Sequence, residues 1–226
     1  MAPDPSTPRS TRRSRGGRRS SGGTVGGVGA EDIQDAYQRR AIAEIAALND
    51  AITGCERCRP DVELPVMSSG SPQAEIMLVK WTASLAERQE GVAFFGRAGS
   101  AILKSVQRLG IEPLMLYGTL CVKCTHLDEA EAARLCPGWL TQELQIVQPK
   151  LVVPMGERVV ETLNGLAFPL SEPLSADPGT VQRWTPTIEA IYVPDIDGSL
   201  DEQGAKRAFW AAFRAVGDWY QAQPPY

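Results

Sequence analysis

The five cysteines of this 226-residue chain fall into two clusters, and this distribution constrains the fold more than any other feature. Cys55 and Cys58 form one Cys-x-x-Cys pair; Cys121 and Cys124 form a second, with Cys136 beyond it. Such a pair places two thiolates on one tight turn, so two distant segments can complete a four-sulfur site. The pattern predicts a metal or iron–sulfur centre that joins the start of the domain to its middle. The alternative is two reduced turns that bind nothing, whereas an odd cysteine count argues against disulfides.

The composition favours one globular domain, residues 31–226, preceded by a tail, residues 1–30. With 43% hydrophobic residues, the chain can bury one good core. No run approaches the roughly 18 apolar residues of a membrane span, and the tail lacks the apolar segment of a secretory signal. These features predict a monomeric, cytoplasmic protein without membrane contact.

Charge is distributed unevenly between the tail and the domain. Residues 1–30 carry six arginines and one aspartate, which gives +5; because the whole chain carries −4, residues 31–226 sum to −9. A cationic tail attracts phosphate backbones, whereas an acidic domain does not. The tail therefore predicts non-specific affinity for DNA or another nucleic acid. The alternative is a solvated extension that affects only solubility.

Apolar runs of strand length alternate with segments of helical periodicity along residues 31–226. We expect strands at 74–79, 114–117, 150–154 and 188–193, and helices at 31–53, 102–109, 128–147, 156–163 and from Ser199 onward. The alternation predicts an α/β fold, in which three α/β/α layers surround a four-stranded, mainly parallel sheet.

Ligands of such folds bind beyond the carboxyl ends of the strands. Here those ends lead into Trp81, Cys121, Gly156 and Asp195. Asp195 and Asp197 could together run acid–base chemistry or hold a divalent cation. Their place between a strand and a helix also fits a simple turn, which we favour.

The order of motifs resembles the iron–sulfur uracil-DNA glycosylases of families 4 and 5. The resemblance begins at the first Cys-x-x-Cys pair, and its strongest pieces are Gly96–Gly99, Val122–Cys124 and Gln145 to Gly156. It extends to the last helix and so covers most of residues 31–226. It implies a uracil-DNA glycosylase-like fold and a relation to base-excision DNA repair.

The resemblance also implies a [4Fe-4S] cluster. Carried over by position, its ligands are Cys55, Cys58, Cys124 and Cys136, and Cys121 is a spare. The interval between the last two ligands is shorter than is usual in the family, so Cys121 stays an alternative third ligand. A four-thiolate zinc site is the other alternative, because cysteine sulfur binds both metals.

The catalytic motifs of the family are replaced in this chain. Phe94 stands at the position that stacks on the flipped base. The family's base-reading asparagine, acidic loop residue and histidine correspond to Leu120, Trp81 and Val193. Leucine can neither donate to nor accept from a base edge, and the loss of such a partner is costly. The resemblance therefore implies a closed pocket and no uracil excision.

Other residues are weaker candidates for a role at the site. Lys80, Gly96, Arg97 and Gly99 fall in loops that could contact phosphate or serve the loop structure. The single histidine, His126, does not match the catalytic position, and we expect a structural or surface role for it.

Two alternatives to a catalytically silent protein stay open. One is an active glycosylase with another lesion preference, using Asp195 or Asp197 beside Phe94. The other is a module that binds a protein partner and never contacts DNA.

Overall fold

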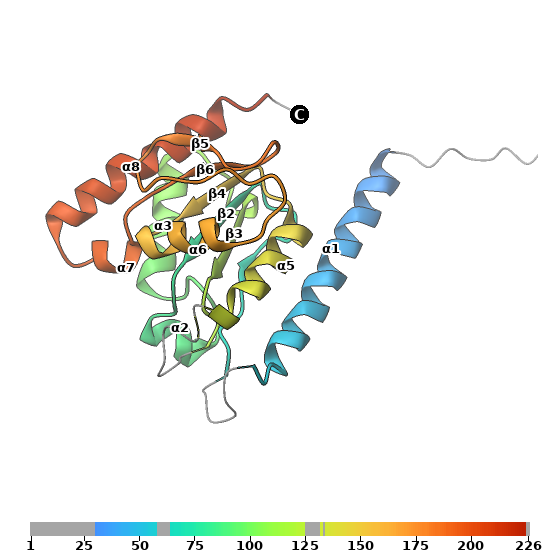
Figure 1. The fold of residues 1–226 in the computed structure, drawn as a ribbon. Coiled ribbons are helices and arrows are strands. Elements are labelled where there is room, and N and C mark those ends of the chain that lie inside the picture. The colour runs from blue at the N-terminus through green and yellow to red at the C-terminus, as the bar shows by residue number, and fades with distance from the viewer. Residues whose placement is uncertain (1–29, 58–63, 125–131, 133, 225–226) are drawn as a thin grey trace, which may run out of the picture.

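The computed structural model describes residues 30–57, 64–124, 132 and 134–224, which fold around one mixed sheet (Figure 1). Within these residues the sheet has six strands in the order β1-β3-β2-β4-β6-β5. The strands are β1 (Ser69–Gly70), β2 (Ile76–Lys80), β3 (Leu116–Leu120), β4 (Leu151–Pro154), β5 (Val181–Arg183) and β6 (Glu189–Ile191). Strands β3, β2, β4 and β6 are parallel, whereas β1 and β5 pair antiparallel at the two edges. The expected parallel core is confirmed, and the sheet is larger than expected by two short edge strands.

Helices cover both faces of the sheet and complete three layers. They are α1 (Ala30–Thr53), α2 (Leu85–Glu90), α3 (Arg97–Arg108), the 3₁₀ turn η1 (Pro113–Met115), α5 (Pro137–Val147), α6 (Glu157–Gly165), α7 (Ile196–Ser199) and α8 (Gln203–Gln221). One core cluster joins α1, α5 and α6 to the sheet, and a second joins α3, α7 and α8 to the opposite face. The fold is therefore the expected α/β/α sandwich.

Strand β2 shows why the central strands of the sheet are continuous apolar runs in the sequence. Met77 and Val79 point into the core under α1, α5 and α6, while Ile76 and Leu78 point into the core under α3 and α8. Successive side chains of a strand face opposite sides. A strand covered on both sides therefore needs apolar residues at every position.

Most expected boundaries differ from the structure by a few residues, and three of the differences have a local cause. The strand expected at 114–117 begins at Leu116, because Pro113 starts a 3₁₀ turn. In the helix expected at 128–147, Cys136 lies at a bend and α5 starts at Pro137; residues 125–131 and 133 lie outside the described residues. Proline is tolerated in a first helical turn, where its missing N–H is not needed. Ser199 does not cap the final helix, because it ends α7, and its hydroxyl donates to the Asp195 carbonyl at 2.5 Å.

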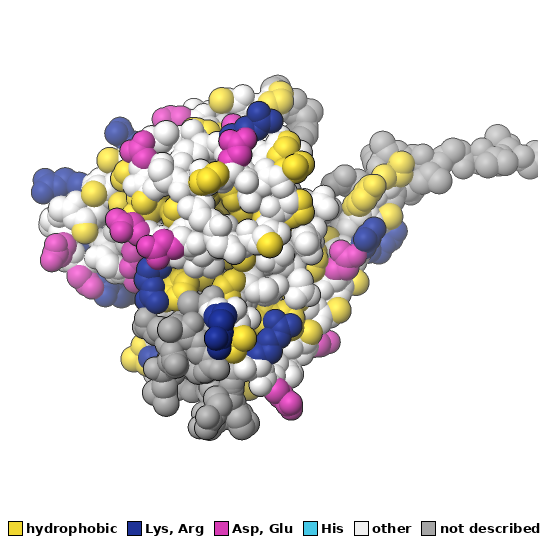
Figure 2. All heavy atoms as spheres, in the orientation of Figure 1, with side chains coloured by type: hydrophobic (Ala, Val, Ile, Leu, Met, Phe, Trp, Pro, Cys, Tyr) yellow, Lys and Arg dark blue, Asp and Glu magenta, His cyan; other side chains and the backbone are white. Residues whose placement is uncertain are grey.

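Helix α1 packs on the domain only near its carboxyl end. Leu48 and Ile52 are buried there, and α1 contacts α5. Earlier in the helix Ile33, Tyr37 and Ile42 are exposed, and Figure 2 shows apolar side chains along this projecting part. No described helix has the length and apolar character needed to span a bilayer.

Candidate functional site

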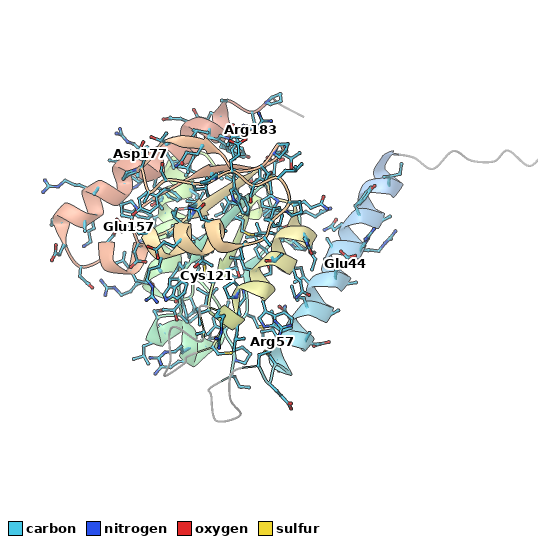
Figure 3. The ribbon with its side chains drawn as sticks, viewed as in Figure 1. Glu44, Arg57, Cys121, Glu157, Asp177 and Arg183 are labelled. Atoms are coloured by element: carbon cyan, nitrogen blue, oxygen red, sulfur yellow. The ribbon has the colours of Figure 1, made fainter. Side chains whose placement is uncertain are left out.

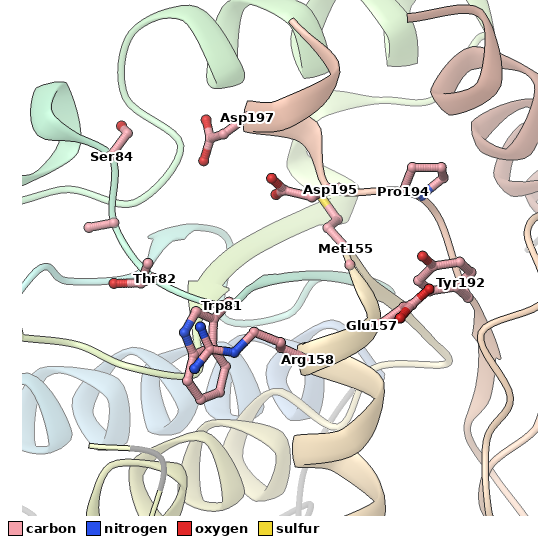
Figure 4. A pocket seen from close by; sticks show the side chains of 12 residues that line it. Trp81, Thr82, Ser84, Met155, Glu157, Arg158, Tyr192, Pro194, Asp195 and Asp197 are labelled. Carbon is pink, nitrogen blue, oxygen red and sulfur yellow. The ribbon is translucent and has the colours of Figure 1, made fainter. Parts of the chain in front are cut away.

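A cleft of about 620 Å³ opens at the carboxyl ends of β2, β4 and β6 (Figure 4). Its walls are the loop 81–84 after β2, residues 155–158 after β4, and residues 192, 194, 195 and 197 after β6. This is the edge of the sheet where the sequence predicts a ligand site. The loops that follow three parallel strands meet here because parallel strands all end at one edge.

Lys80, the last residue of β2, carries a buried ammonium group beside this cleft. Its Nζ lies 2.9 Å and 2.7 Å from the two carboxylate oxygens of Glu87 and 2.5 Å from Oδ2 of Asp197. The Lys80 side chain is 1% exposed and that of Glu87 is fully buried. Burial of a charge is tolerated only with such partners. Lys80 therefore points into the protein, which leaves its ammonium group no surface for a phosphate.

Glu87 connects this ammonium group to two loops. Its carboxylate also accepts the backbone N–H of Ser84 at 2.7 Å and of Phe94 at 2.5 Å. Ser84 and Glu87 form a capping box at the start of α2. Sequence reasoning missed Glu87, although the Ser-x-x-Glu spacing was a readable signal for a helix start.

Phe94 lies next to the same ammonium group. Its ring centroid is 5.5 Å from the Lys80 Nζ. The ring also covers Gly118 of β3, where an added Cβ would lie 2.5 Å from a ring carbon. The proposed stacking residue is therefore half-buried against the sheet and over a cation of the protein itself.

Gly96 and Gly99 have structural roles in the turn from Phe94 into α3. Gly96 precedes the helix with φ of 77°, a conformation that side-chain-bearing residues rarely adopt. A Cβ on Gly99 would lie 1.6 Å from the Phe94 carbonyl oxygen. Arg97 is exposed, and it pairs with Asp201 at 2.6 Å, which ties α3 to the segment before α8.

The three positions that carry catalytic groups in the resembled family are apolar or aromatic here. Leu120 and Val193 are fully buried in separate core clusters. Trp81 lines the cleft, and Figure 4 shows the Arg158 side chain against its ring. The guanidinium carbon of Arg158 lies 4.1 Å from the centroid of this ring. None of the three side chains offers an acid, an amide or an imidazole to a base.

Asp195 and Asp197 lie close together but serve different partners. The Asp195 carboxylate accepts the N–H of Gly198 at 2.9 Å and caps α7, so the favoured turn is present. Asp197 faces Lys80, and burial raises its pKa, with the Lys80 ammonium opposing this shift. Burial, followed by the nearby carboxylates of Glu157 and Asp195, also raises the pKa of Tyr192.

The segments that carry the cysteines contact one another around the start of α5. The backbone N–H of Lys123 donates to Sγ of Cys136 at 3.3 Å. The guanidinium of Arg57, two residues after Cys55, lies 4.3 Å from the ring centroid of Trp139 on α5. Hydrogen bonds from backbone N–H groups to cysteine sulfur are typical around iron–sulfur centres. Cysteine thiolates are the donors that iron–sulfur clusters take, so the type of donor fits such a cluster.

Cys58, one of the four expected ligands, lies outside the described residues, as does His126. Within the described part of the chain, no group of three or more Cys, His, Asp or Glu side chains is close enough to hold a metal ion. Cys55 and Cys124 are half-buried and Cys136 is buried, all without disulfides.

Cys121 is more deeply buried than Cys55 and Cys124 and shares its core cluster with Cys136. It is fully buried in the core cluster under α5 and α6, and Figure 3 places it within the body of the domain. Burial raises the pKa of its thiol to about 12, with Lys123 opposing the shift. In this setting Cys121 is a packed core thiol.

A second buried ion pair lies behind the cysteine segments. Lys123 Nζ is 2.6 Å from Oε2 of Glu143, and both side chains are almost completely buried. The same carboxylate accepts the Thr119 hydroxyl at 2.7 Å and the Tyr117 hydroxyl at 3.2 Å. This network joins the end of β3, the turn before Cys124 and the middle of α5. It was not foreseen from the sequence.

A parallel-centred α/β/α sandwich with its cleft at the carboxyl edge and a Phe-x-Gly-x-x-Gly turn is the class of fold that the structure shows. The sequence model described as the Uracil DNA glycosylase superfamily matches residues 67–210, and the chain belongs to this superfamily. It is also similar to the type-4 uracil-DNA glycosylase of Pyrobaculum aerophilum, with 24% identity over 119 residues. That match covers 50% of this chain and 61% of the relative.

Proposed function

We propose that this chain is a uracil-DNA glycosylase-like iron–sulfur protein, related to base-excision repair, that does not excise uracil. The observation that carries the proposal is the ammonium group of Lys80. It lies over the Phe94 ring, 5.5 Å from the ring centroid, and is paired with Glu87 and Asp197. A flipped base that stacked on Phe94 would have to displace a paired, buried charge.

The energetics oppose uracil binding at this place. Removing one partner of a buried ion pair costs about 3–5 kcal/mol, because the other charge is left unpaired. Leu120 and Val193 offer no hydrogen bond in return, since both are apolar and fully buried. A buried site without the matching polar groups leaves the donors and acceptors of the base edge unpaired, at a cost of about 1–3 kcal/mol for each group. Both effects act against the same reaction.

The proposal includes a [4Fe-4S] cluster held by Cys55, Cys58, Cys124 and Cys136. Its support is the family resemblance and the backbone N–H that Lys123 donates to Sγ of Cys136. The cluster would fix the end of α1, the turn after β3 and the start of α5 to one another. Zinc on the same thiolates is the alternative.

The second candidate is a glycosylase with another base preference. The cleft supports it, because the Asp197 carboxylate is 35% exposed and lies with Trp81 among the residues that line the cleft. A carboxyl group with a raised pKa is suited to proton transfer. In either case we propose that the arginines of residues 1–30 add non-specific affinity for nucleic acid.

A glycosylase assay on anaerobically purified protein tests the proposal. Iron and sulfide are measured first, and oligonucleotides then carry uracil, hypoxanthine or xanthine in single and double strands. The Pyrobaculum aerophilum enzyme under identical conditions is the positive control for uracil. We expect a full cluster and no abasic sites. Uracil release would overturn the proposal, whereas release of another base that stops in Asp197→Asn would establish the second candidate.

A further inference from the structure

Two neighbouring helices carry positive charge on a domain that is otherwise acidic. Helix α3 has three cationic residues and no acid, and α8 has three cationic residues and one acid, so together they carry +5. Residues 31–226 as a whole sum to −9. The rest of the domain therefore carries −14, and helices α3 and α8 are a local concentration of positive charge on it.

The charges gather at a groove of about 340 Å³ between these helices. Its polar walls include Lys104 and Arg108 from α3 and Lys206 and Arg207 from α8. Lys104 and Arg108 are four residues apart and therefore lie on one face of α3. All four side chains are exposed, no Asp or Glu is among the residues that line the groove, and none of the four is in an ion pair with a described carboxylate.

An aromatic ring lies in the same groove. Trp210 is half-buried, and the guanidinium carbon of Arg108 lies 5.9 Å from its ring centroid. Phe209 and Ile196 form the apolar floor beside it. A cationic groove that includes an aromatic ring is the arrangement with which proteins hold single-stranded nucleic acid, since phosphates meet the cations and bases meet the ring.

The opposite charge is found at the cleft beyond the strand ends. Glu157, Asp195 and Asp197 line that cleft together with one cation, Arg158, so its lining carries −2, and the ammonium group of Lys80 is buried behind it. Carboxylates at an open edge repel a phosphate backbone. Phosphate binding is therefore favoured at the α3–α8 groove and opposed at the strand ends.

We propose that the groove between α3 and α8 binds a single strand of nucleic acid through its phosphates, with Trp210 as a stacking surface. This interaction is separate from any reaction at the cleft and does not depend on the absence of uracil excision. We infer a nucleic-acid strand as the occupant because its phosphates complement the cations of the groove and its bases can stack on Trp210. An acidic protein segment is the competing occupant.

Fluorescence anisotropy with a labelled oligothymidylate tests the groove in the full chain. The variant Lys104→Gln/Arg207→Gln removes two groove charges and leaves Arg108 on Trp210. The control Arg39→Gln/Arg183→Gln removes two exposed charges from α1 and β5 and changes the net charge equally. Both variants keep residues 1–30, so the contribution of the tail is the same.

We expect the groove variant to bind at least several-fold more weakly at low salt. The slope of log affinity against log salt should fall by about 1.4, because each phosphate contact to a single strand contributes about 0.7. The control should match the wild type. Equal losses in both variants would overturn the proposal, because net charge alone would then explain them. Wild-type protein that binds polyglutamate but not oligothymidylate would overturn it in favour of an acidic protein partner.

Discussion

The Lys80 ammonium and the Glu87 carboxylate form a two-oxygen contact, at 2.9 Å and 2.7 Å, in which both side chains are inaccessible to solvent. Glu87 holds Lys80 and, through two backbone N–H groups, also fixes the loops that begin α2 and precede α3. A lysine at the end of β2 is stable in this fold because that carboxylate is already turned inward.

Lys80→Met should destabilise the domain by about 3–5 kcal/mol, because Glu87 is left as an unpaired buried charge. Urea unfolding of matched variants measures this. Lys80→Met/Glu87→Gln should recover much of the loss, since the amide keeps a hydrogen-bonding group without the charge. Lys104→Met, an exposed position on α3, should change stability by no more than about 0.5 kcal/mol. A single Lys80→Met variant as stable as wild type would contradict the role of the pair.

Asp197 should give stability an identifiable pH dependence. Burial raises its pKa in the folded protein above the ordinary value of 3.8; the Lys80 ammonium opposes this shift, and the Glu87 and Asp195 carboxylates add to it. A raised folded pKa contributes stability below the unfolded pKa, and this contribution is lost as pH rises through the folded pKa. Wild type should therefore lose stability relative to Asp197→Asn as pH increases from about 3.8 upward. Urea unfolding of both proteins across this range measures the difference. A difference that is constant with pH, or that grows in favour of wild type, would show that the Lys80 attraction outweighs burial.

The parallel centre of the fold could be predicted because buried strands leave a simple trace in the sequence. Apolar runs locate β2, β3, β4 and β6 within a few residues. The edge strands β1 and β5 have two and three residues, too few for a periodic pattern, and were missed. Helix α2 was missed because its six residues are too short to show periodicity.

The interior of the candidate site could not be predicted in the same way. The order of motifs assigns Trp81, Leu120 and Val193 to the catalytic positions of the family, and this assignment stays a prediction. It does not show that Lys80 turns inward, because the ammonium group depends on Asp197, which comes from a distant strand end. Contacts of this kind arise from tertiary packing and leave no local pattern.

Glu143→Leu should strongly destabilise the domain, because Lys123 would remain buried without a counter-charge and two hydroxyl donors would lose their acceptor. The expected loss is about 3–5 kcal/mol. Lys123→Met/Glu143→Leu removes both charges and should be more stable than the single variant. Chemical denaturation compares wild type, the single variants Glu143→Leu and Lys123→Met, and the double variant. If the double variant lost as much as the sum of the two single variants, the two side chains would not be coupled.

The third cluster ligand can be identified by comparing alanine variants of Cys121 and Cys124. Cys121 is a fully buried core thiol, whereas Cys124 is half-buried at the turn that follows Lys123. Cys124→Ala should therefore lose iron and sulfide and lower the melting temperature, as should Cys55→Ala and Cys136→Ala, because the cluster joins segments that are distant in sequence. Cys121→Ala should keep the wild-type iron and sulfide content and lose only packing stability. Metal analysis with the visible absorbance of the cluster measures these outcomes. Iron lost from Cys121→Ala and kept in Cys124→Ala would reverse the assignment, and zinc in place of iron and sulfide would replace the cluster by a four-thiolate zinc site.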